Sequence, residues 1–103
     1  MNKLFDIKYV DLDLNTKEKF ETIRHLAKLA QDRLIDVDKY VEDVKAREAM
    51  STTGIGDGVA IPHAKSAYVK FPTVIVGKSS KGIDWESLDD EPVNLVFLIA
   101  VPE

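Results

Sequence analysis

Hydrophobic residues recur at helical spacing in the first half of the chain. Asn15 and Glu18 stand three apart, the spacing of a capping box, and predict a helix that begins at Asn15. Its apolar stripe consists of Phe20, Ile23, Ala27, Ala30 and Leu34. A second helix is predicted from about Asp36 to about Ala49. Its apolar face consists of Val37, Tyr40, Val41 and Val44.

The remaining apolar segments indicate strands. Apolar and polar residues alternate weakly over residues 4–14, which predicts a short strand or an extended lead-in. Thr73–Gly77 is typical of a buried strand, residues 81–84 indicate a turn, and Trp85 is expected to fill one end of the core. Val93–Val101 is so continuously apolar that we expect both faces of that strand to be covered. Helices followed by strands indicate an α/β fold, with α+β as the alternative.

Length and composition narrow the class of protein. The 103 residues predict a single domain, residues 1–103. The absence of cysteine excludes a disulfide framework, a thiolate zinc site and a cysteine nucleophile. A net charge of −4 argues against nucleic-acid binding, which needs clustered Lys and Arg. The longest apolar run, Leu95–Val101, is too short to span a bilayer, so we expect a cytoplasmic protein.

A glycine-rich segment leads to a histidine. Residues 51–58 place glycines at alternate positions 54, 56 and 58, which suits neither a helix nor a strand and predicts a tight loop. A short apolar strand or strand end, Val59–Pro62, follows and then His63. Because proline fixes its own backbone and restricts the preceding residue, Pro62 would present the His63 side chain rigidly.

These residue types suit the binding of an anion next to a nucleophile. Backbone amides of residues 54–58 and the hydroxyls of Ser51, Thr52 and Thr53 can donate hydrogen bonds, and Arg47 offers a planar fork for phosphate. A neutral His63 is nucleophilic near pH 7. Spacing alone favours a structural role for these residues. His63 would then be a hydrogen-bonded loop histidine, and residues 54–58 would form a turn that binds no ligand. Arg47 would be a solvated arginine at the end of a helix. We predict no metal and no other cofactor.

One stretch of sequence carries a family resemblance. The matching residues are Glu48, Ile55, Gly56, Val59, Ala60, Ile61, Pro62, His63 and Ala64. They resemble the phosphohistidine signature of the fructose/mannitol type of enzyme IIA in the bacterial phosphoenolpyruvate-dependent sugar phosphotransferase system. Segments 82–85 and 93–97 are similar as well, and the likeness extends from about Leu14 to the last residue.

The resemblance implies a phosphotransferase of a sugar-uptake relay. His63 would accept a phosphoryl group from the phosphocarrier protein HPr and donate it to an enzyme IIB, with membrane contact only indirectly through a IIC permease. Arg47 would lie near the phosphoryl group. The pocket would be shaped by Ser51, Thr52, Thr53, Gly54 and Gly56. The implied fold is a mixed sheet flanked by helices.

The chain departs from the family at its C-terminal end. The family usually has a second histidine after the strand that matches Val93–Val101, whereas this chain ends at Glu103, and its other histidine, His25, is expected on the surface. We therefore expect a shortened domain, with exposed apolar surface that favours self-association. Two alternatives remain. One is a regulatory module, of the nitrogen type or linked to a regulator, whose phosphorylation on His63 controls protein contacts. The other is a fragment that folds but does not relay.

Overall fold

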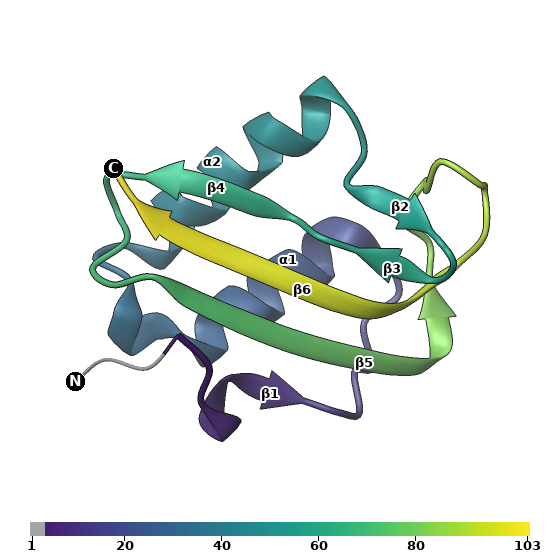
Figure 1. Ribbon diagram of the computed structural model, residues 1–103, viewed down its shortest axis with the longest axis horizontal. Helices are drawn as coiled ribbons and strands as arrows, with labels where there is room; N and C mark the ends of the chain where they lie inside the picture. The colour runs from purple at the N-terminus through teal and green to yellow at the C-terminus, as the bar shows by residue number, and fades with distance from the viewer. Residues whose placement is uncertain (1–3) are drawn as a thin grey trace.

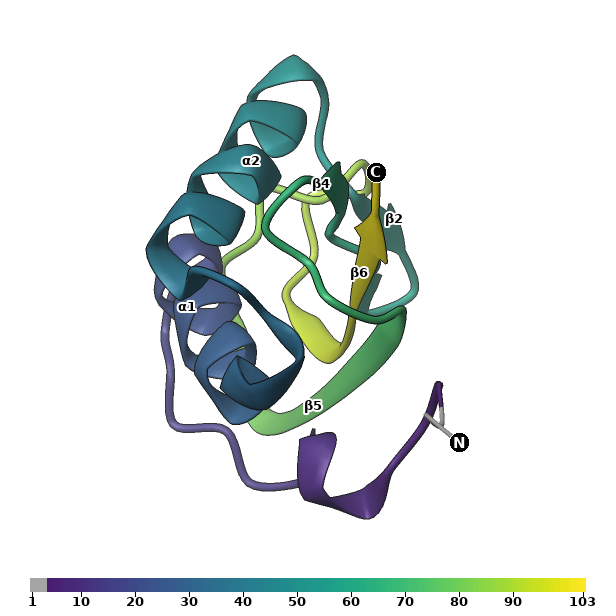
Figure 2. The same cartoon turned by 90° about the vertical axis from the view of Figure 1, so that its left-hand side faces the viewer.

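A six-stranded mixed sheet carries the helices on one face (Figures 1 and 2). The computed structural model describes residues 4–103, so residues 1–3 of the predicted domain lie outside the described residues. The helices are α1 (Lys19–Leu29) and α2 (Val37–Met50), and short 3-10 turns occupy Ile7–Tyr9 and Gln31–Arg33. The strands are β1 (Val10–Asp11), β2 (Gly54–Gly56), β3 (Val59–Ala60), β4 (His63–Ser66), β5 (Thr73–Ile83) and β6 (Val93–Pro102).

Strand β6 is the centre of the sheet. The order is β1-β5-β6-β3-β2, with β4 pairing β6 beside β3. β6 is antiparallel to β5, with Val76 opposite Phe97, and parallel to β4, with His63 opposite Ile99. The sequence-based expectation of a mixed sheet with helices in a single domain is thereby confirmed.

The expectation that both faces of β6 are covered is wrong for the described residues. Val96, Leu98 and Ala100 are fully buried, whereas Leu95, Phe97 and Ile99 are only partly buried. Figure 2 shows why: α1 and α2 lie on the same side of the sheet. Because successive side chains of a strand point to opposite faces, one set packs under the helices and the other set does not.

Helix α1 begins at Lys19, so the predicted start at Asn15 is wrong. The amide of Leu14 donates to the carbonyl of Lys78, and the amide of Asp84 donates to the carbonyl of Lys17. These contacts keep the chain extended along β5, because the segment's backbone groups pair with another strand. The N-cap is Glu18, whose side chain makes no capping bond.

The predicted stripe of α1 is only partly buried. Ile23 and Ala27 are fully buried within the helix, whereas Phe20 is exposed at its first turn. The helix ends at Leu29, before Leu34. Leu34 is nevertheless buried in the hydrophobic core, and it forms an isolated antiparallel bridge with Val69.

The second predicted helix, from about Asp36 to about Ala49, is confirmed by α2. The side chain of Asp36 caps it by accepting a hydrogen bond from the amide of Lys39, and Tyr40, Val41 and Val44 are fully buried. A short polar side chain at the N-cap satisfies one of the free amides of the first turn. Among residues 4–103, no helix is long and apolar enough to cross a membrane.

The other strand predictions are partly confirmed. β5 contains Thr73–Gly77 but continues to Ile83, through residues that we expected to form a turn. The pairing of β5 with β6 shifts register there, and Gly82 has φ +89°. Gly82 thus accommodates an irregularity within the strand. Trp85 is fully buried, as expected, and residues 4–14 contain only the two-residue strand β1.

Candidate functional site

His63 is the first residue of β4 and lies on the face of the sheet that the helices leave open. The hydroxyl of Ser66 donates to the carboxylate of Asp43 on α2, at 2.6 Å, so Ser66 faces that helix. Ala64 is buried, like Ser66, whereas His63 is half-buried and Lys65 is exposed. By strand alternation, His63 and Lys65 therefore point to the other face.

The imidazole of His63 is held in one tautomer. Its Nδ1 lies 2.8 Å from the carbonyl oxygen of Ile61. A carbonyl oxygen can only accept, so this hydrogen bond requires the proton on Nδ1. In the neutral ring, Nε2 then carries the free lone pair. No other hydrogen bond involves the His63 ring among residues 4–103.

The peptide before His63 is fixed from both sides. The amide of Ile61 donates to the carbonyl of Thr53 at 3.0 Å, and the amide of Ile99 donates to the carbonyl of Pro62 at 3.0 Å. Pro62 is buried and has a fixed φ. The carbonyl that accepts from His63 is consequently anchored by strand β6 and by the loop that precedes β2.

Residues 54–60 form a hairpin, so the predicted loop is only partly correct. Gly54–Gly56 is strand β2, and Gly56 pairs with Val59 across the turn residues Asp57 and Gly58. Gly56, Asp57 and Gly58 all have positive φ, at 105°, 56° and 77°. An Asp-Gly turn with this geometry matches the right-handed twist of adjacent strands.

Several donors that we assigned to an anion cradle already have partners in the protein. The amide and hydroxyl of Thr53 both donate to the carboxylate of Glu48, at 2.8 and 2.6 Å. The amide of Gly54 donates to the hydroxyl oxygen of Thr52, and the amide of Asp57 donates to Asp89. Thr53 and Gly54 thus serve the structure of the loop itself.

Arg47 lies in the last turn of α2. Its Nη1 donates to the carbonyl of Ser51 at 2.9 Å, so the guanidinium closes the C-terminal end of the helix. No hydrogen bond joins Arg47 to His63 in the described part of the chain. Among residues 4–103, no other hydrogen bond of the Arg47 side chain is found, and none of the Ser51 hydroxyl. The hydroxyl of Thr52 accepts from Gly54 and keeps its own proton to donate.

The sequence signature contains Glu48, but sequence reasoning assigned it no role. Its side chain is fully buried, and the Nζ of Lys19 lies 4.0 Å from its Oε2. Lys19 also lies 3.5 Å from the carboxylate of Glu86. The contacts of Glu48 with Thr53 and Lys19 have one signal in the sequence, which is a glutamate in the last turn of a helix, five residues before a threonine.

The second histidine is not part of this site. His25 is on α1, and its Nε2 lies 2.7 Å from the carboxylate of Asp11 on β1. Its side chain is 43% exposed, in line with the expected surface position. The hydrogen bond from His25, and next that from the Asp13 amide, hold the pKa of the Asp11 carboxyl below its usual range.

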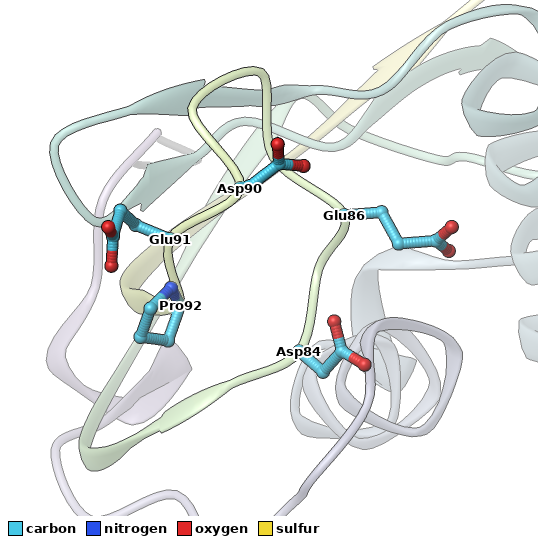
Figure 3. Close-up of a pocket in the computed structure, with 5 residues that line it drawn as sticks. All are labelled: Asp84, Glu86, Asp90, Glu91 and Pro92. Carbon is cyan, nitrogen blue, oxygen red and sulfur yellow. The ribbon is translucent and has the colours of Figure 1, made fainter.

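An acidic pocket of about 400 Å³ lies beside the loop after β5 (Figure 3). It is lined by Asp84, Glu86, Asp90, Glu91 and Pro92. Figure 3 shows the carboxylates of Asp84 and Glu86 on one side and that of Glu91 directed away from them. Carboxylates repel phosphate, so this pocket does not suit a phosphoryl group. Within residues 4–103, no group of three or more His, Asp or Glu is placed to hold a metal ion.

Comparison with known proteins matches residues 3–103 to the family described as phosphoenolpyruvate-dependent sugar phosphotransferase system, EIIA 2. The chain is 43% identical over 96 residues to the PTS system fructose-specific EIIABC component of Bacillus subtilis, covering 91% of this chain and 15% of that protein. It is 39% identical over 98 residues to the fructose-specific EIIA component of Haloferax volcanii, covering 93% of this chain and 64% of that one.

A solved structure has the same fold. The nitrogen regulatory protein IIA-Ntr from Neisseria meningitidis superposes with a TM-score of 0.90 at 29% identity, covering 97% of this chain and 69% of that chain. The present chain spans less than two thirds of the length of either fructose-specific relative.

Proposed function

The chain belongs to the EIIA 2 family of the phosphoenolpyruvate-dependent sugar phosphotransferase system, and we propose that it is a phosphocarrier that holds a phosphoryl group on Nε2 of His63. The observation that carries this proposal is the hydrogen bond from Nδ1 of His63 to the carbonyl of Ile61. In the neutral ring it leaves the Nε2 lone pair free, on a half-buried residue, and no hydrogen bond to Nε2 is found among residues 4–103. A nucleophile needs such a lone pair, directed at its substrate.

The transfer would proceed by in-line exchange between two nitrogen atoms. The Nε2 lone pair of His63 attacks the phosphorus of a phosphohistidine donor, and an N–P bond forms. The donor's own P–N bond breaks, and its electron pair returns to the donor nitrogen. The His63 ring gains positive charge in this step, which the Ile61 carbonyl stabilises through the Nδ1 proton. The reverse sequence delivers the group to the next acceptor.

Phosphoryl transfer requires positioning and charge stabilisation more than covalent help from the protein. We assign the stabilisation of the phosphoryl oxygens to Arg47 and to the hydroxyls of Ser51 and Thr52. Arg47 uses one nitrogen to hold the Ser51 carbonyl and keeps further N–H groups free. Gly56 contributes the tight turn that leads back toward His63.

The partners we propose are HPr as donor and an enzyme IIB as acceptor, with a IIC permease linking the relay to the membrane. The B. subtilis relative supports this, because its name joins EIIA, B and C components. A fructose-type relay in the cytoplasm is the most economical assignment, since both relatives are described as fructose-specific. The enzyme class would be a phosphotransferase.

The test is an intact-mass measurement after incubation with phosphoenolpyruvate, enzyme I and HPr. We expect an acid-labile gain of one phosphoryl group that a His63→Ala variant does not show. A His25→Ala variant is the matched control and should gain the group as the unmodified chain does. A folded protein that gains nothing, or a gain that persists in His63→Ala, would contradict the proposal.

A regulatory role of the nitrogen type is the second candidate. The observation that favours it is the superposition on IIA-Ntr with a TM-score of 0.90. Both roles share the phosphorylation of His63 and differ in the fate of the phosphoryl group. Transfer from the phosphorylated chain to a fructose-type enzyme IIB would support sugar uptake, whereas a stable phosphorylated form that ignores IIB would support regulation.

A further inference from the structure

A path of hydrogen bonds and short backbone segments connects Glu48 to the imidazole of His63. The carboxylate of Glu48 accepts from both the amide and the hydroxyl of Thr53, at 2.8 and 2.6 Å. The carbonyl of Thr53 accepts from the amide of Ile61 at 3.0 Å. The carbonyl of Ile61 accepts from Nδ1 of His63 at 2.8 Å. The Glu48 carboxylate on α2 is thus linked to the His63 ring on β4 through three contacts: Glu48 with Thr53, Thr53 with Ile61, and Ile61 with His63.

The first two members of this path are buried, whereas Ile61 and His63 are partly buried. Glu48 and Thr53 are buried, at 4% exposed each, and neither can exchange its partner for bulk water. The amide and the carbonyl of Ile61 belong to different peptide groups. The coupling between them therefore passes through the covalent backbone of Ile61 and depends on its position. A displacement of Thr53 therefore moves the backbone of Ile61, and with it the carbonyl that fixes the histidine ring.

A buried carboxylate is costly to the fold unless its charge is compensated. Two donors from Thr53 and the ammonium of Lys19, 4.0 Å away, provide that compensation for Glu48. Glu48 is also the neighbour of Arg47 in the last turn of α2. The same carboxylate therefore anchors the loop that runs from Arg47 toward the strand of His63.

We propose that Glu48 is a positioning residue for His63: by holding Thr53, it sets the Ile61 carbonyl that keeps the imidazole in its Nδ1–H tautomer with Nε2 free. This inference rests on the phosphocarrier function proposed above. In that role Glu48 contacts neither the phosphoryl group nor the His63 ring, and its effect passes through Thr53 and Ile61.

The test uses Thr53→Val, which keeps the branched shape and removes the hydroxyl that donates to Glu48. Thr53→Ser restores a hydroxyl and is the conservative rescue. The matched control is Thr22→Val, because Thr22 is also fully buried and donates its hydroxyl at 2.7 Å to the carbonyl of Glu18, outside this path. The readouts are the ¹⁵N shifts of the His63 ring in the unphosphorylated protein, the rate of phosphoryl gain from HPr, and thermal unfolding.

We expect Thr53→Val to raise the fraction of the Nε2–H tautomer of His63 and to slow phosphoryl gain roughly tenfold to a hundredfold, as expected for a misplaced reacting group. Thr53→Ser should keep the wild-type tautomer and rate. Thr22→Val should lower the unfolding temperature and leave both unchanged. An unchanged tautomer in Thr53→Val, or equal slowing in Thr22→Val, would overturn the proposal.

If Thr53→Val does not fold, Glu48→Gln replaces it, because a glutamine offers one acceptor oxygen where the carboxylate offers two. The same tautomer change is then expected. If the unmodified chain accepts no phosphoryl group, the phosphocarrier function fails, yet the ring ¹⁵N shifts still decide whether Glu48 and Thr53 control the His63 tautomer.

Discussion

The hydroxyl of Tyr40 donates a hydrogen bond to the carbonyl oxygen of Ile99, 3.1 Å away, and Ile99 is the register partner of His63. This contact ties α2 to the central strand at the level of the candidate nucleophile. Tyr40 is fully buried. Burial, and secondarily the negative charge of Asp43, raise the pKa of its phenol well above the usual range.

Replacing Tyr40 by Phe should lower the free energy of unfolding by about 1 kcal/mol near pH 7, the usual net value of one hydrogen bond. The raised pKa means that the folded state prefers the neutral phenol. Its stabilising contribution is therefore complete below about pH 10, the pKa of an unfolded tyrosine, and is lost as the pH rises above that value. Tyr40→Phe should remove this component of alkaline destabilisation, as measured by urea unfolding between pH 8 and 11. An unchanged profile would contradict the assignment.

Arg47→Ala should slow phosphoryl gain from HPr by roughly tenfold or more, because a preorganised donor to the phosphoryl oxygens is lost. Arg47→Lys should recover only part of the rate, since an ammonium lacks the planar fork. Lys45→Ala is the control, because it removes the same charge from the same helix at a partly exposed position. Equal slowing in Lys45→Ala would attribute the effect to net charge rather than to Arg47.

Gly54→Ala should destabilise the fold by about 1–3 kcal/mol, the usual cost of overpacking. A Cβ at Gly54 would lie 2.5 Å from the hydroxyl oxygen of Ser87 and 2.9 Å from its Cα, so both the side chain and the backbone must shift. Thermal unfolding measures the loss. Ser51→Ala, at an exposed neighbour, should change stability by less than about 0.5 kcal/mol. A Gly54→Ala protein as stable as the parent would contradict the close packing of β2 against Ser87 in the loop after β5.

His25→Ala should raise the pKa of the Asp11 carboxyl toward its ordinary value of about 3.9. The pair with His25 lowers that pKa, so its stabilising contribution is present above about pH 4 and is lost as the pH falls through the folded-state value. Carboxyl ¹³C shifts measured during acid titration follow Asp11 directly. Asp89 serves as the internal reference, because amides of Glu91 and Asp57 lower its pKa and His25 does not contribute. An Asp11 titration that His25→Ala leaves unaltered would refute the pairing.

Short sequence patterns predicted correctly those elements whose ends are set by residues close in the sequence. The N-cap Asp36 marks the start of α2 because a single side chain satisfies an adjacent amide. The same reasoning failed at Asn15, because the amide of Leu14 pairs with β5 and the carbonyl of Lys17 pairs with Asp84, both far along the sequence. The capping-box pattern is present in the sequence, but strand pairing determines where α1 begins.

The sequence by itself determined α2, the central strand β6, the buried Trp85 and the placement of His63 directly after a proline, because short-range periodicity and backbone restriction specify these features. Only the tertiary structure decided that Thr53 donates to Glu48 and that His63 faces away from the helices. It also decided that Ile61 selects the tautomer of the ring. The physical reason is that hydrogen-bond partners and sheet faces depend on register between distant segments, and a one-residue shift in register reverses the face of every side chain in a strand.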